Sequence, residues 1–136
     1  MIWPFRRKSK KRMARIVIDE PITSSTRVSV LKALKQIEDR EFPALILRID
    51  SPGGTVGDSQ EIYSAIKRLK EKGCKVVASF GNISASGGVY IGVAAHKIVA
   101  NPGTITGSIG VIIRGNNLSE LLNKIGIKFE TVKSGI

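Results

Sequence analysis

The chain has 136 residues, of which 42% are apolar and 5% aromatic. It is long enough to bury the core of one ordinary domain without a disulfide or a structural metal. Lys and Arg total 22 against 11 Asp and Glu, which gives a net charge of +11, and there is one cysteine and one histidine. These counts exclude a disulfide framework, a multi-cysteine zinc site and most histidine-built metal centres. We therefore expect neither a metal nor another cofactor.

The excess of positive charge is concentrated at the N-terminus. Residues 1–15 hold seven basic side chains and no acidic one. We predict that residues 1–15 form a flexible basic leader and that residues 16–136 form a single domain. The basic residues precede no apolar stretch of signal-peptide length, and the chain has no run of 18 apolar residues. The sequence thus predicts no cleavable signal peptide and no transmembrane segment. We therefore expect the chain to be located on the cytoplasmic side.

The leader has two open interpretations. Trp3 and Phe5 stand beside the cluster of cations, and such a segment can lie on an anionic membrane surface. The alternative is a solvated tail with no partner. Nucleic acid is not an expected partner, because no basic and aromatic pattern continues into the domain.

Past the leader, short β-branched runs alternate with helical periods. In chain order we predict a strand over residues 15–19, a helix from 24 to 40, a strand over 44–49, and a helix from the turn at 51–54 to Gly73. These are followed by a strand over 75–80, a turn over 81–88, a helix over 89–95, a strand over 97–100, a helix over 117–125 and a strand over 128–132. The run at 44–49 is mostly apolar, which is typical of a strand covered on both faces. Strands that alternate with helices predict right-handed crossovers, a parallel sheet and an α/β fold.

Two glycine-bearing turns follow apolar strands, at the edge where open α/β sheets bind ligands. In residues 50–54 (DSPGG), two glycines permit a positive φ and a close approach to the backbone. Residues 84–88 (SASGG) place Ser86 at the opening of a helix, which suits a nucleophile whose attack creates an oxyanion. Each turn alone is equally compatible with a structural role: a tight turn in the first case, and helix capping by Ser86 in the second.

Considered together, these motifs identify a family. Residues 48–54 (RIDSPGG), 85–88 (ASGG), 101–111 (NPGTITGSIGV) and 133–135 (KSG) resemble the signal peptide peptidase A family of Ser–Lys serine peptidases. The resemblance extends from residue 14 to residue 136 and is closest in style to cyanobacterial members. It implies a crotonase/Clp-protease-like spiral of parallel strands with crossover helices, incomplete at the C-terminus.

The resemblance also implies the roles of individual residues. Ser86 would be the nucleophile, and the amides of Gly53 and Gly87 would form the oxyanion hole. The family's general base is a lysine. The closest members read K-S-G-x-x-K-D from Lys133 onward, and their usual base, the second lysine, would fall two residues beyond Ile136. Lys133 is the alternative base, since it matches the base position of some longer members. His96 is interpreted as an ordinary surface or packing residue.

The function implied by the resemblance is a serine endopeptidase that uses a Ser–Lys dyad. Its substrates would be signal-peptide remnants or other membrane-derived polypeptides, and the full-length form would be a homo-oligomer. We expect the 136-residue chain to lack its base and its C-terminal part. Two alternatives stay open: a non-catalytic fragment or assembly module, and a crotonase-type acyl-CoA enzyme. The second is less favoured because such enzymes usually work with glutamates, and none lies near either turn.

Overall fold

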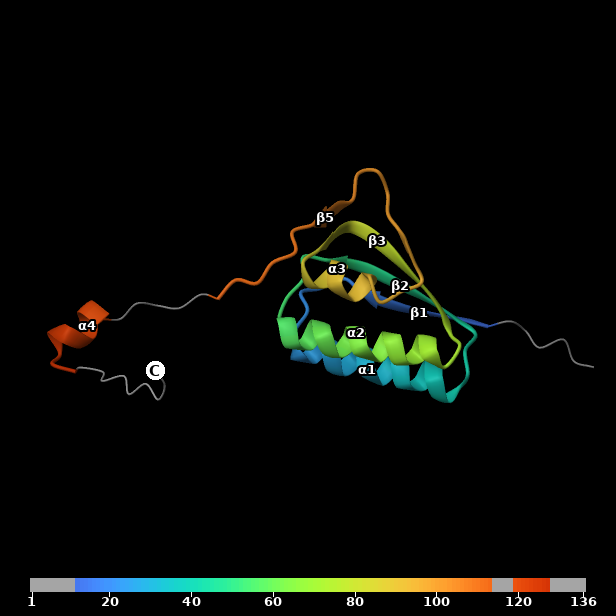
Figure 1. The fold of residues 1–136 in the computed structure, drawn as a ribbon, viewed down its shortest axis with the longest axis horizontal. Coiled ribbons are helices and arrows are strands. Elements are labelled where there is room, and N and C mark those ends of the chain that lie inside the picture. The colour runs from blue at the N-terminus through green and yellow to red at the C-terminus, as the bar shows by residue number, and fades with distance from the viewer. Residues whose placement is uncertain (1–11, 114–118, 128–136) are drawn as a thin grey trace, which may run out of the picture.

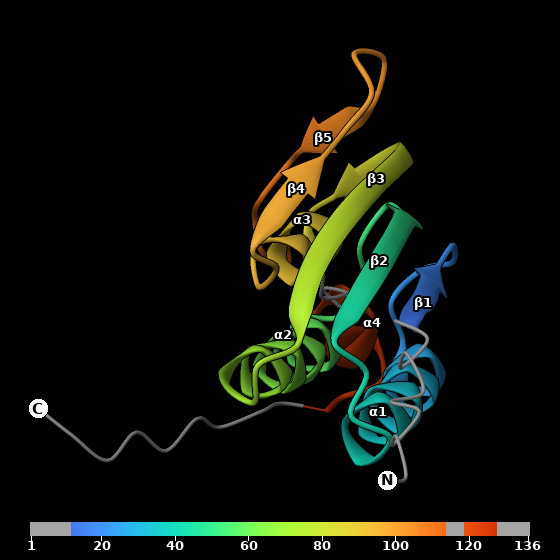
Figure 2. The same cartoon turned by 90° about the vertical axis from the view of Figure 1, so that its right-hand side faces the viewer.

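Strands and helices alternate along the chain, as the sequence predicts. The computed structural model describes residues 12–113 and 119–127. The elements are β1 (Met13–Ile18), α1 (Ser24–Asp39), β2 (Ala44–Ser51), α2 (Val56–Glu71), β3 (Lys75–Ala85), α3 (Gly87–Gly92), β4 (Lys97–Val99), β5 (Ile105–Gly107) and α4 (Ser119–Lys124). The described strands pair in parallel in the order β1-β2-β3-β4, and β5 pairs with β3 (Figure 2). The α/β class and the parallel sheet are therefore confirmed.

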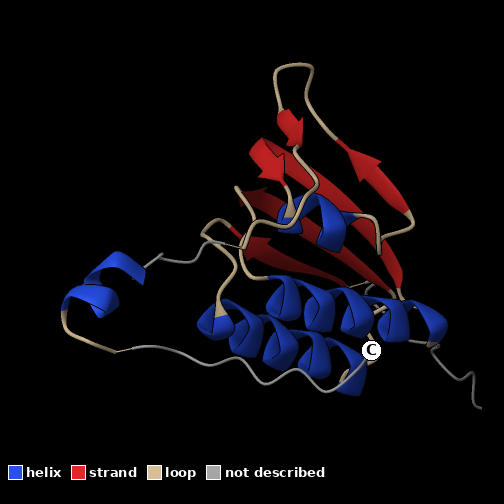
Figure 3. Ribbon diagram, turned by 60° about the vertical axis from the view of Figure 1, so that its left-hand side comes forward, coloured by secondary structure: helices blue, strands red, loops and turns tan. Residues whose placement is uncertain are grey.

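The helices α1, α2 and α3 pack on one face of the sheet (Figures 1 and 3). The side chains of Leu45, Leu47 and Ile49 on β2 point into the core beneath these helices and are at most 1% exposed. The β2 residues between them are only half-buried. The expectation that this strand is covered on both faces is thus not met within residues 12–113 and 119–127, because the helices that pack on it share one side.

The apolar stripes of α1 and α2 form the other half of the core. The buried stripe residues are Val30, Leu34 and Ile37 on α1 and Ile62, Ile66 and Leu69 on α2. Fully burying such a side chain contributes about 1.5–3 kcal/mol. Val28, another apolar residue of α1, is 58% exposed. Its position falls outside the face defined by helical spacing of the other three residues of α1.

The prediction of a turn over residues 81–88 is wrong. Strand β3 continues to Ala85, and α3 already begins at Gly87. The extension exists because β5 adds to it: Ile83, Ser84 and Ala85 lie opposite residues 105–107. Our prediction had no strand at 105–107, although the β-branched run at 104–106 (TIT) is a signal for one.

The predictions for the two ends of the chain are tested only in part, because some of the residues concerned lie outside the described ranges. Strand β1 begins at Met13, inside the segment that we assigned to the leader, while residues 1–11 lie outside the described part. The helix α4 lies within the predicted helix at 117–125. The predicted strand at 128–132 lies outside the described residues. In the described ranges, we find no helix with the length and apolar character needed to span a bilayer.

Candidate active site

Ser86 occupies a strained turn between β3 and α3. Its φ is +51°, a value that residues other than glycine rarely adopt. The Ser86 amide donates to the carbonyl of Gly107 at 2.9 Å, and the Ser86 carbonyl accepts from the amide of Tyr90 at 3.0 Å. These two bonds hold the turn between β5 and the first turn of α3. A serine on a strained strand-to-helix turn is a recurrent way of presenting a nucleophile.

The two turns that the sequence singles out are in direct contact. Gly53 has a φ of +97°, and a Cβ atom built on it would lie 2.7 Å from the amide nitrogen of Gly87. The same atom would lie 2.9 Å from Cβ of Ser86. Real Cβ atoms do not approach other atoms so closely. Only a glycine therefore allows the first turn to pass this close to the nucleophile turn.

The amides of the first turn differ in what they contact. The Gly53 amide donates to Oγ of Ser51 at 3.2 Å, and Gly53 does not line the cavity described below. Gly54 does line it, and its nitrogen lies 3.4 Å from where a Cβ on Gly87 would be. Within the described residues, the amides of Gly54 and Gly87 have no hydrogen-bond acceptor. The amides of Gly54 and Gly87 are therefore two neighbouring, unpaired donors at the cavity.

A cavity of about 280 Å³ opens at Ser86. Besides the glycine backbone and the two serines Ser59 and Ser86, its wall consists of the side chains of Val56, Tyr90, Ile109 and Val111, so it is largely apolar. No lysine, histidine or carboxylate lines it among the residues that the structure describes. The cavity can accept an apolar side chain, but its described wall contains no general base.

The carboxylate of Asp50 connects β2 to the part of β3 that carries Ser86. The register shifts here, because Ile49 lies opposite Phe80 whereas Ser51 lies opposite Ser84. The shift leaves extra β3 residues without a regular partner. Oδ1 of Asp50 accepts from the amide of Ile83 at 3.0 Å, which replaces the missing ladder bond. Asp50 thus fixes the end of β3 next to the glycine turn at residues 50–54. The sequence analysis did not predict this role.

These hydrogen bonds predict how stability depends on pH. The bonds from Ile83 and Asn82, with the nearby charge of Arg48, lower the pKa of Asp50. A carboxyl whose pKa is lower in the folded state stabilises the fold above its unfolded pKa of about 3.9. That stabilisation is lost as the pH falls through the folded pKa.

We therefore expect Asp50→Asn to lower the free energy of unfolding at pH 7 and to converge with the wild type in strong acid. Urea unfolding between pH 7 and pH 2 measures both curves. If the two curves run parallel over this range, the carboxylate has no such role.

Three serines near the turn differ in accessibility. Ser84 is completely buried, and its hydroxyl has no hydrogen-bond partner within the described residues. Ser86, two residues later, is half-buried and lines the cavity. Ser59 of α2 packs beneath the turn: its Oγ donates to the carbonyl of Thr55 at 2.8 Å. A Cβ on Gly87 would lie 2.4 Å from this Oγ. Only Ser86 combines access with an adjacent pair of unpaired amides.

His96, another titratable residue weighed in the sequence, does not approach Ser86 in the described structure. His96 accepts a hydrogen bond at Nδ1 from the amide of Val76, at 3.0 Å. Val76 is near the start of β3 and Ser86 follows its end, so at about 3.3 Å per residue the two are roughly 30 Å apart along the strand. His96 is thus a structural residue at the opposite end of the sheet. Lys133 lies outside the described residues.

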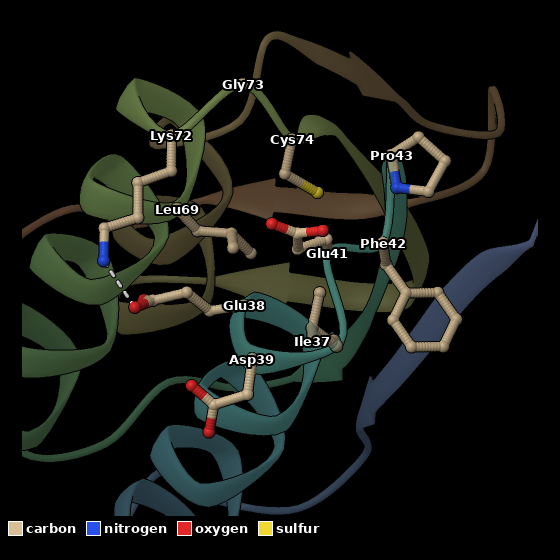
Figure 4. A pocket seen from close by; sticks show the side chains of 10 residues that line it. All are labelled: Ile37, Glu38, Asp39, Glu41, Phe42, Pro43, Leu69, Lys72, Gly73 and Cys74. Carbon is tan, nitrogen blue, oxygen red and sulfur yellow. Dashed lines mark hydrogen bonds and ion pairs between the residues drawn. The ribbon is translucent and has the colours of Figure 1, made fainter.

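A larger cavity, of about 470 Å³, lies far from this turn (Figure 4). It is formed where α1 and α2 end, next to Cys74 and to the ion pair between Lys72 and Glu38. Cys74 is 4% exposed, and burial raises the pKa of its thiol. A buried thiol held protonated is a poor nucleophile. Size alone therefore does not make this cavity the candidate active site.

The chain is similar to proteases in sequence and in fold. The model of "Peptidase family S49" matches residues 68–136. The chain is 63% identical over 135 residues to the Synechocystis sp. protein slr0021, whose name calls it a candidate protease; the match covers 99% of this chain and 48% of that protein. It is 44% identical over 98 residues to the serine protease SPPA of Arabidopsis thaliana, covering 72% of this chain and 14% of that protein. The chain therefore spans about half or less of the length of these relatives.

The fold comparison agrees with the predicted fold class. A mutant of ClpP1 from Listeria monocytogenes superposes with a TM-score of 0.56 at 26% sequence identity. The match covers 60% of this chain and 46% of that one. The Clp-protease-like α/β fold implied by the sequence is thus confirmed.

Proposed function

This chain belongs to peptidase family S49, and from this we propose that the full-length protein is a serine endopeptidase with Ser86 as its nucleophile. The observation that carries the proposal is the contact between the two glycine turns, which sets an accessible serine beside two unpaired amides. Attack of Oγ on a peptide carbonyl would form one C–O bond and place negative charge on the carbonyl oxygen. Amide donors aimed at that oxygen stabilise the transition state more than the ground state.

We propose the oxyanion hole at the amides of Gly87 and of the turn formed by Gly53 and Gly54. The family resemblance points to Gly53. The contacts favour Gly54 as the second donor, since the Gly53 amide already donates to Ser51 and only Gly54 lines the cavity. Two donors from separate loops, converging on one oxygen, suit a tetrahedral oxyanion.

The proposed general base is a lysine that removes the proton from the hydroxyl of Ser86. A lysine can do so near neutral pH only when desolvation lowers its pKa from about 10.4. The motif that starts at Lys133 offers two candidates, of which we favour the second lysine, two residues beyond Ile136. Lys133 stays the alternative.

Substitution of each motif lysine in the full-length protein distinguishes the two candidates. We expect alanine at the second lysine to lower kcat by about 10²–10⁴-fold, the usual contribution of a positioned general base. Arginine there should be equally inactive, because a guanidinium keeps its proton. We expect Lys133→Ala to retain activity within about tenfold of the wild type, since only the base contributes proton transfer. The reverse pattern of losses would make Lys133 the base.

The proposed substrates are polypeptides with apolar side chains next to the scissile bond, such as signal-peptide remnants or other membrane-derived segments. The apolar wall of the cavity, with Val56, Ile109 and Val111, supports this class. We further propose that the full-length protein is a homo-oligomer and that the basic leader holds it at the cytoplasmic side of an anionic membrane. An acyl-CoA enzyme is disfavoured, since no glutamate lines the described wall of the cavity.

A further inference from the structure

We propose that Tyr63 is a positioning residue that sets the width of the cavity beside Ser86, because its ring holds the ring of Tyr90 in the cavity wall. The inference rests on the proposed function, since it assigns to this wall the selection between large and small substrate side chains.

Tyr90 belongs to both the wall and the nucleophile turn. It follows Ser86 by four residues on α3, and its amide donates to the carbonyl of Ser86 at 3.0 Å. Its side chain lines the cavity and is 36% exposed. A tyrosine with this much exposure on a six-residue helix has room to adopt a rotamer that points into solvent. Some other group must therefore keep its ring against the cavity.

Tyr63 of α2 is the group that meets this ring. The two ring centroids are 4.8 Å apart, and the ring planes are inclined by 21°, so the rings are stacked. Tyr63 is itself half-buried against the hydrophobic core, which fixes the stacking platform. Aromatic pairs at this separation attract each other beyond their burial of area. The stack therefore connects the core-anchored helix α2 to the wall residue on α3.

Loss of the Tyr63 ring should release that of Tyr90. Tyr90 can then turn toward solvent, and the cavity becomes wider. Large substrate side chains gain room, whereas small ones lose contacts, so the preference between them shifts. Lys67 provides a matched control, since its Nζ lies 5.8 Å from the Tyr63 ring centroid and its loss leaves the stack in place.

The test is the ratio of kcat/KM for two peptides that differ only in having Phe or Ala before the scissile bond. In the full-length protein, we expect Tyr63→Ala to raise the Phe-to-Ala ratio by about tenfold, within the range by which pockets discriminate side-chain size. Tyr63→Phe, which keeps the stack, and Lys67→Ala should leave the ratio within about twofold of the wild type. An equal loss for both peptides in Tyr63→Ala would mean a purely structural role and would overturn the inference.

A second measurement does not depend on activity. A crystal structure of Tyr63→Ala should place the ring of Tyr90 out of the cavity wall. A ring that keeps its place would overturn the inference, whether or not the protein cleaves peptides. Failure of the proposed function has a separate signature, which is peptide hydrolysis that does not require Ser86.

Discussion

The Gly53→Ala variant of the full-length protein should lose at least about 10²-fold in kcat/KM, because misplacing catalytic groups by about 1 Å costs this much. The added Cβ would lie 2.7 Å from the nitrogen of Gly87, 2.8 Å from the carbonyl oxygen of Ala85 and 2.9 Å from Cβ of Ser86. Two of these atoms are backbone and cannot rotate away. The nucleophile and the oxyanion donor must therefore both move. The φ of +97° adds strain for any residue with a side chain.

Gly57→Ala is the matched control for this substitution. Gly57 lies only four residues later, in α2, and a Cβ there meets nothing within 4 Å. Alanine should leave activity unchanged and stabilise the helix by up to about 1 kcal/mol. Peptide hydrolysis and thermal unfolding of both variants separate a catalytic loss from a folding loss. Wild-type kcat/KM in Gly53→Ala would show that the contact between the turns is not needed for catalysis.

The parts of the fold that depend on local patterns were predictable from the sequence. The apolar stripe of Ile62, Ile66 and Leu69 on α2 repeats at helical spacing. Gly73, which has a φ of +95°, follows the C-terminal end of α2, where the sequence predicts that the helix stops. The class of fold follows from the alternation of such helices with β-branched runs. Strand β5 was missed because three residues become a strand only by pairing with the extension of β3.

The candidate site was predictable only as a set of motifs. The sequence identified Ser86 and the glycines of both turns, but the distance of 2.7 Å from Gly53 to Gly87 depends on segments more than 30 residues apart. The preference for Gly54 over Gly53 depends on which amide is already bonded, which no spacing reveals. The role of Asp50 arises from a register shift between two strands. Such shifts have no signature in either strand alone.

Substitution of Ser86 tests the central claim most directly. The nucleophile forms the covalent bond to the substrate, so its removal leaves only binding and the oxyanion hole to act. Ser84→Ala is the matched control, because Ser84 lies two residues before Ser86, near the end of β3, and is completely buried. Its hydroxyl has no partner within the described residues, so its removal should not destabilise the fold.

The deciding measurement is kcat/KM for an apolar peptide in the wild-type full-length protein, in Ser86→Ala and in Ser84→Ala. The structure predicts a fall of at least about 10³-fold for Ser86→Ala with an unchanged melting temperature. It predicts activity within about threefold of the wild type for Ser84→Ala, because a buried hydroxyl cannot reach the substrate. Near-normal hydrolysis by a folded Ser86→Ala variant would contradict the assignment of Ser86 as the nucleophile.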